Sequence, residues 1–536
     1  MSTLPASARY DALIIGAGHN GLVCAAYLAR AGRRVLVLEA GAAVGGAAIT
    51  QEFTPGFRVS AGAHLLHLMP ARIEQELGLS QHGLEMAATH LPTMALHASA
   101  PPGTEAPLAW AGGAAAHLRP PAGLTPTETA AYSSYTAQLS EFAAALQPIF
   151  EGTPPRLGTK AWSDKLSWLR LGWQVRRLGR RHMRELLRIG AMNVFDLLQE
   201  HFADPRLQGA LAFDAVLGSN YGPRSPGTVL TLLCRAAAQR VAGSGGLRQP
   251  RGGLGALSAA LARAAAAAGA EIRLETEVAQ ILVNDDRASG VRLRSGAAIQ
   301  AAAVISNADP KRTFLELLGT AHLDTGFVRR VHHLRTQGMT GKLHLALSGV
   351  PRFGGLSDAQ LQGRVILAPS MDYLERAFNS TKYGEYAAAP TMEITLPTLS
   401  DSTLAPPGAH VLSAVVQYLP YALKEGWEAG RQRCLETLIK ALEARSPGLA
   451  ALVQGAQLLT PVDIEQRMRI TGGHWHHAEL AFDQFYMVRP VPGAAQYSTP
   501  LPGLYLCGAG SHPGGGVMGY AGRNAARQVL AQRGKP

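Results

Sequence analysis

The most constraining feature of this sequence is a glycine-rich turn near the N-terminus, set between a short apolar run and a helical pattern. The apolar run covers residues 11–15, and the turn reads Gly16-Ala17-Gly18-His19-Asn20-Gly21. A helix-period stretch from Leu22 to Arg30, closed by Gly32, leads to a second apolar run, Val35 to Leu38, that ends at Glu39. This order predicts the start of a βαβ unit that binds a dinucleotide beside a parallel sheet.

Each part of the turn has a physical role. Gly16 permits the tight turn, Gly18 lets the backbone approach a pyrophosphate, and Gly21 lets the helix pack closely on the strand. His19 and Asn20 lie between these glycines, where the helix N-terminus faces the phosphates. Glu39 follows Gly16 by 23 positions, close to the expected spacing of about 20, so its carboxylate is predicted to bind the adenosine ribose.

A second glycine-rich segment near the C-terminus predicts the other end of a flavin site. The run LYLCGAGSHPGGGVMG, residues 504–519, predicts a strand, a loop with few side chains and the start of a helix that extends to about Gln532. The helix N-terminus, expected near residues 517–520, would stabilise the anionic edge of reduced flavin. The cofactor predicted from both ends of the chain is FAD, with expected contacts in this loop at Gly508, Gly510, Gly516, Val517 and Met518.

A third element, Gly45-Gly46, follows Glu39 by six residues. It resembles the second glycine pair of FAD proteins related to glutathione reductase and the amine oxidases, in which this pair touches the diphosphate. Many of those proteins place an arginine two positions before the pair, whereas this chain has Ala43. The departure argues against a typical amine oxidase.

Further segments make the resemblance more specific. PRGGLGALSAALARA at residues 250–264, SNADP at 306–310 and the C-terminal run look similar to phytoene desaturase-like flavoproteins. The His19-Asn20 pair, GGHWHH at 472–477 and Arg489-Pro490 resemble most closely the branch of pyridine nucleotide-disulphide oxidoreductase domain-containing protein 2. The resemblance implies bound FAD and oxidation or rearrangement of an apolar, unsaturated molecule. It also implies that Val278 contacts adenine through its backbone and that Asn307 lies where the chain returns to the flavin.

The expected fold class is α/β, with a glutathione-reductase-type Rossmann FAD-binding domain and a discontinuous α+β substrate domain. We expect FAD-binding segments at residues 1–90, 246–330 and 466–536, and substrate-domain segments at 91–245 and 331–465. Expected helices are an alanine-rich one that follows the glycine turn at Gly252 and ends at about Ala268, and one at 426–444. Expected strands include 290–293, 299–306, 392–396 and 410–417. The Ala, Pro and Gly-rich stretch 98–125 is expected to loop over the surface.

The predicted chemistry is removal of a hydride and a proton from adjacent carbons, with the hydride going to flavin N5. Histidine is the natural base near neutral pH, which makes His64, His474, His476 and His477 candidates, each weighed against a purely structural role. Of these, His474, His64 and His477 are the predicted catalytic residues. The sequence contains neither a second dinucleotide fingerprint nor a CxxC pair, so oxygen or a quinone is the expected electron acceptor. No metal is predicted, because the HxHH cluster has no spaced carboxylate or cysteine partner. A redox-neutral FAD-dependent isomerase, a flavin amine oxidase and a non-enzymatic FAD-bearing interaction protein remain alternatives.

Charge is concentrated in one segment. The chain carries +12 in total, and residues 160–188 contribute +7 of it, in a predicted basic amphipathic helix over 160–190. One interpretation packs its apolar stripe of Trp168, Leu171, Val175, Leu178 and Leu186 on the protein itself, and the other docks the helix peripherally on anionic lipid. Nucleic acid is not an expected partner, since no binding motif accompanies the charge. Isolated cysteines and the lack of an apolar N-terminal or spanning segment favour a cytoplasmic location, and the sequence carries no signal for oligomeric state.

Overall fold

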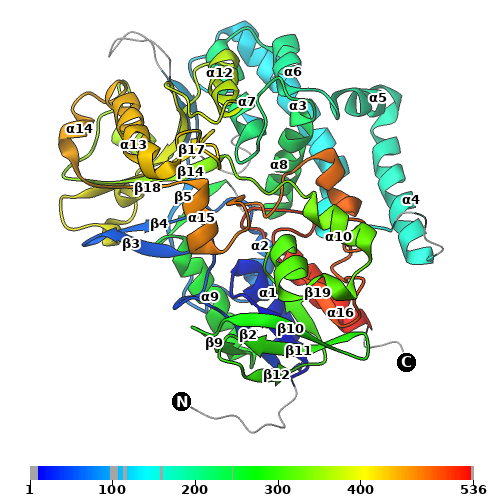
Figure 1. Cartoon of the computed structure of the whole chain (residues 1–536). Coiled ribbons are helices and arrows are strands. Elements are labelled where there is room, and N and C mark those ends of the chain that lie inside the picture. The colour runs from blue at the N-terminus through cyan, green and yellow to red at the C-terminus, as the bar shows by residue number, and fades with distance from the viewer. Residues whose placement is uncertain are drawn as a thin grey trace.

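The N-terminal, central and C-terminal parts of the chain meet in one parallel sheet. A computed structural model describes residues 10–96, 107–112, 118–156, 158, 161–243 and 246–532. The five strands of this sheet are β19 (Leu504–Leu506), β13 (Val304–Ser306), β1 (Ala12–Ile15), β2 (Val35–Leu38) and β9 (Glu271–Arg273), in that order. Every neighbouring pair is parallel, so the carboxyl ends of all five strands lie at the same edge. The sheet lies in the lower half of Figure 1, where β2, β9 and β19 are labelled.

Helices cover one face of this sheet and a small antiparallel sheet covers the other. Ile14 and Val37 face a core shared with α1 (His19–Arg30), α9 (Leu254–Ala267) and α16 (Tyr520–Gln532). Leu13 and Leu36 face the opposite core, with β10 (Val278–Asn284), β11 (Arg287–Leu293) and β12 (Ala298–Gln300). Burial on both faces is why the strands read as continuous apolar runs in the sequence.

A second, seven-stranded sheet lies above the first in Figure 1. Its strands, in spatial order, are β18 (Val453–Leu459), β14 (Thr340–Leu347), β17 (His410–Gln417), β16 (Thr391–Thr395), β15 (Arg364–Leu367), β6 (Thr93–Ala95) and β7 (Leu108–Trp110). All pairs are antiparallel except β15 with β6. One apolar core joins this sheet to α13 (Trp427–Glu443). Another joins it to a helical layer of α3 (Pro126–Glu151), α6 (Val194–His201), α7 (Pro205–Val216), α8 (Thr228–Ala242) and α12 (Met371–Thr381).

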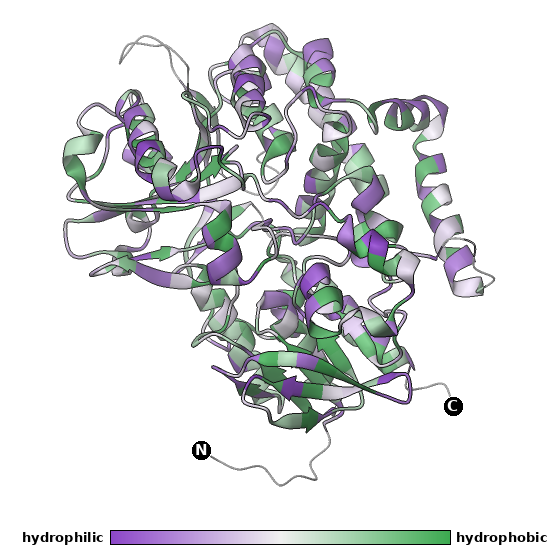
Figure 2. Cartoon of the chain, in the orientation of Figure 1, coloured by the Kyte–Doolittle hydropathy of each residue, from purple (hydrophilic) through white to green (hydrophobic). Residues whose placement is uncertain are grey.

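Shorter elements connect these layers. There are also two antiparallel sheets of two strands each in the described chain. One pairs β3 (Thr50–Thr54) with β4 (Phe57–Ser60), and the other pairs β5 (Met86–Leu91) with β8 (Leu247–Pro250). The remaining α-helices of the described chain outside the basic segment are α2 (Ala71–Glu76), α10 (Thr325–His332), α11 (Asp358–Leu361), α14 (Leu449–Leu452) and α15 (Pro461–Met468). None of the helices within the described ranges is long and apolar enough to span a bilayer. Figure 2 shows the hydrophobic residues gathered on the strands and inner helix faces.

The fold class is the predicted one, an α/β fold with a parallel Rossmann-type sheet and a separate, largely antiparallel sheet. The C-terminal helix begins at Tyr520, within the expected range, because the glycine loop continues through Gly519, whose φ is +75°. Three local expectations need correction. The strand expected over 299–306 is interrupted at Ala301–Ala303, because the chain leaves β12 to join a different sheet in β13.

The other two corrections concern the segments expected at 98–125 and 160–190. The first contains β7, and its residues 98–106 and 113–117 lie outside the described part of the chain. The second segment forms two helices, α4 (Trp162–Arg177) and α5 (Gly179–Ile189). Its first residue, 160, lies outside the described part of the chain. The two helices separate at Gly179, whose φ of +78° cannot continue a helix.

Candidate FAD and substrate site

The first glycine turn is closed by a residue almost 300 positions away. Asn307, directly after β13, donates its backbone N–H to the Ile15 carbonyl (2.9 Å) and its side-chain Nδ2 to the Gly16 carbonyl (3.3 Å). A Cβ at Gly18 would lie 2.7 Å from Asn307 Nδ2, and one at Gly21 would lie 2.3 Å from the Gly16 oxygen. Glycine is therefore required at Gly21, where a Cβ would collide with backbone, and at Gly18 a Cβ would displace the Asn307 amide that bonds the turn.

The second glycine pair packs directly on the first turn. Gly45 donates its N–H to the Ala17 carbonyl (2.9 Å), and a β-bridge joins Gly18 to Gly45. Gly45 and Gly46 have φ of +132° and +58°, conformations that L side chains rarely adopt. The resemblance-based expectation that this pair borders the same nucleotide site as the first turn agrees with this contact.

Glu39 lies at the carboxyl end of β2, where the sheet edge meets the glycine turn. Its Oε2 accepts from the Ala17 N–H (2.7 Å) and its Oε1 from the Gly41 N–H (2.9 Å). These bonds fix the carboxylate while each oxygen keeps a free lone pair for a ribose hydroxyl. Val278, the first residue of β10, lines the same cavity beyond Glu39.

The C-terminal glycine loop contributes backbone to the cavity through its second half. Gly516, Val517 and Met518 line the cavity, whereas Gly508 and Gly510, expected as flavin contacts, do not. A Cβ at Gly508 would lie 2.5 Å from the Asn307 oxygen, and one at Gly510 would lie 2.5 Å from Pro310 Cδ. The absence of a Cβ at these positions lets the loop pack against the segment that follows β13, while Ala509 between them lines the cavity. Contact of Gly508 and Gly510 with the flavin stays a prediction.

Arg489 holds this loop to the histidine-rich segment. Its side chain is fully buried and donates to five backbone carbonyls, those of His476, Ala478, Glu479, Gln484 and Ala509, at 2.7 to 3.3 Å. Burial lowers the pKa of the guanidinium to about 10, with Glu479 opposing the shift, so the group stays charged at neutral pH. Five charge-assisted bonds from one planar group fix both segments relative to each other.

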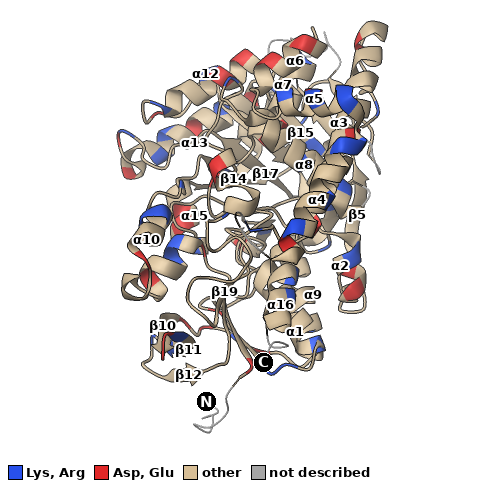
Figure 3. Ribbon diagram, turned by 90° about the vertical axis from the view of Figure 1, so that its right-hand side faces the viewer, with Lys and Arg blue, Asp and Glu red and all other residues tan. Residues whose placement is uncertain are grey.

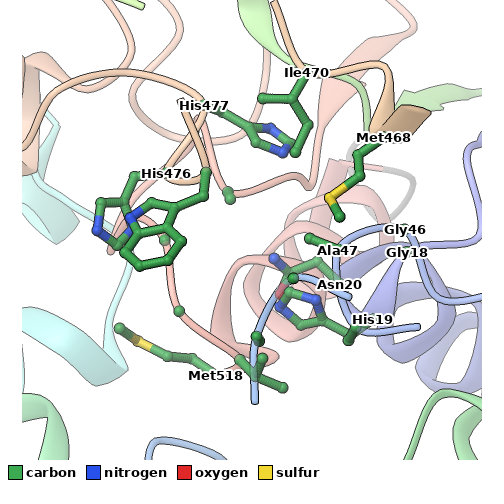
Figure 4. Close-up of a pocket in the computed structure, with 18 of the residues that line it drawn as sticks. Gly18, His19, Asn20, Gly46, Ala47, Met468, Ile470, His476, His477 and Met518 are labelled. Carbon is green, nitrogen blue, oxygen red and sulfur yellow. The ribbon is translucent and has the colours of Figure 1, made fainter. Parts of the chain in front are cut away.

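The two glycine loops and the histidine segment enclose a single cavity with a volume of about 340 Å³. Figure 4 shows Gly18, His19 and Asn20 on one side, Met518 below, and His476 and His477 opposite them. Within the described residues, several buried polar atoms that belong to cavity-lining side chains have no hydrogen-bond partner: His19 Nε2, Asn20 Oδ1, Trp475 Nε1, His476 Nδ1 and His477 Nδ1. A cofactor rich in carbonyl, hydroxyl and phosphate oxygens would supply such partners, and the side-chain-free cradle at Gly18 and Gly46 leaves room for a diphosphate. FAD fits this site.

The predicted catalytic histidines lie in three different environments. His477 lines the cavity, and burial lowers its pKa to about 4, opposed by Asp309. His474 is buried behind the cavity wall, where its Nδ1 accepts from the His476 N–H (3.3 Å) and its Nε2 lies 3.5 Å from Glu479 Oε2. His474 is thus placed to position His476 rather than to touch a substrate. His476, also one of the histidines considered from the sequence, lines the cavity directly.

His64 lines the opposite wall as part of a buried charge network that sequence reasoning missed. Its Nε2 lies 2.7 Å from Glu393 Oε1, and Lys342 Nζ lies 2.9 Å from its Nδ1. Burial and Lys342 lower the pKa of His64 to about 4 although Glu393 opposes them, so the imidazole is neutral at pH 7. Since Lys342 bonds Nδ1, the proton of the ring is on Nε2 and points to Glu393.

The network continues from Glu393 away from the histidine. Glu393 pairs with Arg364, which also contacts Asp214 (2.5 Å), and Arg235 lies 3.3 Å from the same Asp214 oxygen. Burial lowers the pKa of Lys342 to about 7, with Glu393 opposing the shift. The signal that was available in the sequence is a lone charge inside a buried strand, Lys342 in TGKLHLAL and Glu393 in TMEIT.

A parallel sheet with a glycine cradle at its carboxyl edge, closed by a C-terminal glycine loop, defines the class of FAD-dependent oxidoreductases. Comparison with known proteins agrees, since residues 21–530 match the family described as flavin containing amine oxidoreductase. The chain belongs to this family, and its cofactor is FAD.

The chain is also similar to individual proteins of known sequence or structure. It is 35% identical to mouse pyridine nucleotide-disulfide oxidoreductase domain-containing protein 2, over 97% of this chain and 93% of that protein. It is 28% identical to the neurosporene-forming phytoene desaturase of Cereibacter sphaeroides, over 69% and 70% of the two chains. The fold is shared with an oxidoreductase from Methanosarcina mazei, at a TM-score of 0.59 and 19% identity, over 97% of this chain and all of that one.

Proposed function

We propose that the protein is a desaturase or dehydrogenase that acts on a CH–CH bond of an apolar, unsaturated isoprenoid or lipid-like molecule. The observation that carries the proposal is the composition of the cavity beyond the glycine loops. Its wall there is formed mostly by apolar side chains, among them Leu68, Phe150, Leu217, Ala238, Leu480 and Phe485. Such a wall binds hydrocarbon by burying apolar surface and excludes water from the reacting carbons.

The reaction converts a C–C single bond to a double bond by breaking two C–H bonds. When bound, FAD supplies the acceptor for the hydride and passes the electrons to oxygen or a quinone. The chain itself must take the remaining proton from the adjacent carbon. His477 and His476 on one wall are neutral imidazoles, because burial lowers the pKa of each, and a weak base suffices when the neighbouring positive charge is delocalised over a polyene.

The Lys342–His64–Glu393 chain offers a second proton acceptor on the opposite wall. A Lys342 amine with a pKa near 7 is partly neutral at physiological pH and accepts a proton that His64 then shares with Glu393. His64 therefore acts within a hydrogen-bonded chain rather than as an isolated base.

Amine oxidation is the second candidate, favoured by the name of the family to which the chain belongs. Two features of this chain weigh against it. Ala43 stands where many family members have an arginine. In addition, the two carboxylates of the buried network, Glu393 and Asp214, are already paired with Arg364 and Arg235, so the network attracts an ammonium group only weakly. A redox-neutral isomerase and an FAD-bearing interaction protein rank below both.

Anaerobic titration of the purified, FAD-loaded protein separates these functions. Polyenes, long-chain unsaturated lipids and amines are added in turn while the oxidised flavin absorbance band is followed. We expect an apolar alkene to bleach the band and amines to leave it unchanged. Bleaching by amines alone would establish the second candidate, whereas an alkene that is isomerised without net bleaching would establish the isomerase. A band that persists with every compound and no product would leave only the interaction protein.

A further inference from the structure

The basic helices α4 and α5 carry an unexpected set of exposed apolar side chains. In the described part of the chain eight large hydrophobic residues are exposed, and five of them lie on these two helices. They are Trp162 (80% exposed), Leu166 (46%), Leu169 (66%), Trp173 (64%) and Leu187 (71%). Figure 1 shows α4 and α5 at the right-hand edge of the molecule.

The four apolar residues of α4 form one stripe. They follow one another at intervals of four, three and four residues, which places them within about 60° of arc on the helix surface. The opposite side of α4 carries the other apolar set, of which Leu171, Val175 and Leu178 pack against the cores of the protein. These contacts and the hydrogen bond from Gln496 to Asp164 hold α4 to the protein, whereas the outer stripe is exposed in the described part of the chain.

Positive charge flanks the outer stripe. Six exposed arginines on α4 and α5 form no ion pair within the described residues: Arg170, Arg176, Arg177, Arg180, Arg181 and Arg184. At 100° per residue Arg176 lies about 50° from the centre of the stripe on one side, and Arg177 lies a similar angle away on the other. Figure 3, which faces this side of the molecule, shows Lys and Arg along both helices.

We propose that α4 and α5 form a docking surface for an anionic lipid bilayer, with Trp162, Leu166, Leu169 and Trp173 entering the interface and the flanking arginines binding lipid headgroup phosphates. An exposed tryptophan and leucine stripe between rows of arginine is the pattern of a helix that lies in a membrane interface. A second copy of this chain is a poor occupant, because two segments of net charge +7 would face each other.

The helix that carries this surface is joined to an element of the cavity wall. α4 packs on α3, and Phe150, near the end of α3, lines the cavity. Asp164 of α4 accepts a hydrogen bond from Gln496 (3.1 Å), which ties the helix to the segment that precedes the C-terminal loop. The docking surface does not depend on which substrate is used.

Co-sedimentation of the full-length, FAD-loaded protein with lipid vesicles tests the proposal. We expect binding to vesicles of phosphatidylcholine mixed with phosphatidylglycerol, and weak binding to phosphatidylcholine alone. Replacing Trp162 and Trp173 together by serine should weaken binding on the order of tenfold or more. Replacing Arg176, Arg177 and Arg180 together by glutamine should weaken binding to the anionic vesicles and reduce its dependence on salt.

Tyr383→Ser is the matched control, because Tyr383 is 73% exposed but lies outside α4 and α5. This variant should bind vesicles like the wild type, and the flavin spectrum of every variant should be unchanged. Equal binding by the tryptophan, arginine and control variants would overturn the proposal, as would wild-type protein that stays in the supernatant with both lipid mixtures. A dimer in analytical ultracentrifugation that the Trp162 and Trp173 substitutions dissociate would also overturn it and make this face an interface between copies.

Discussion

Asn307 joins three segments that are far apart in the sequence. Its backbone N–H binds the end of β1, its Nδ2 binds the Gly16 carbonyl, and its own carbonyl lies against Gly508 in the C-terminal loop. The side chain also lies against Gly18, so any side chain added there meets a fixed amide rather than open space. The shape of the nucleotide cradle therefore depends on the backbone and side-chain amide atoms of one residue, Asn307.

Gly18→Glu tests this cradle. A Cβ at residue 18 would be 2.7 Å from Asn307 Nδ2, and a carboxylate would place negative charge where the pyrophosphate is expected. We predict loss of FAD, measured as the ratio of flavin to protein absorbance after purification. Gly172→Glu is the control, because nothing lies within 4 Å of a Cβ at this exposed helical glycine. Full flavin content in Gly18→Glu would contradict the assignment of the cradle.

The lowered pKa of Lys342 can be tested without a substrate, through the pH dependence of stability. Burial lowers its pKa from 10.5 to about 7 in the folded protein, so between these pH values the unfolded chain binds more protons than the folded one. The free energy of unfolding therefore gains a contribution that increases as the pH rises from about 7 to about 10. Relative to Lys342→Met, the wild type should become more stable across this window by at least about 1.4 kcal/mol, the value of one pKa unit. Urea denaturation at several pH values measures it, and parallel curves for the two proteins would refute it.

At the scale of elements, local pattern and long-range contact differ in how well the sequence predicts them. The βαβ start, the second glycine pair and the strand at residues 410–417 follow from residues that are adjacent in the chain, and the structure places them as predicted. The break between α4 and α5 also had a local signal in Gly179, which the continuous helical pattern on either side concealed. The role of Arg489 had no local signal in the sequence, because its five hydrogen-bond acceptors are backbone carbonyls, which every residue has.

Arg489→Met tests how the two segments around the flavin loop are held together. Methionine fills a similar volume but removes five hydrogen bonds. The Glu479 carbonyl keeps a donor in Gln484 Nε2, whereas the other four carbonyls lose the bond from Arg489, and each such loss costs about 1 kcal/mol or more. We predict destabilisation on the order of 3 kcal/mol or more together with reduced FAD content, measured by denaturant titration and flavin absorbance. Arg489→Lys should recover little of the lost stability or FAD content, since an ammonium group cannot reproduce the planar arrangement of the guanidinium N–H donors. A stable variant with full flavin content would show that the loop is held by other contacts.

At the scale of the whole molecule, the site is assembled from both sheets. The parallel sheet supplies the glycine cradle and Glu39, while Lys342 and Glu393 come from β14 and β16 of the antiparallel sheet, and His64 follows β4. Sequence motifs identified the nucleotide side, because its geometry is local to short segments. The charge network was missed because its members are spread from His64 to Glu393, and only the folded packing brings them together.

The proposed reaction removes hydrogen from a CH–CH bond of an apolar molecule held in the cavity. It can be tested by a single anaerobic turnover of FAD-loaded protein with the alkene that bleaches the flavin band, followed by mass spectrometry of the extracted product. We predict a product that has lost two hydrogen atoms and gained one double bond, in an amount equal to the flavin reduced. A product of unchanged mass, or flavin reduction only by amines with release of an aldehyde or imine, would contradict it.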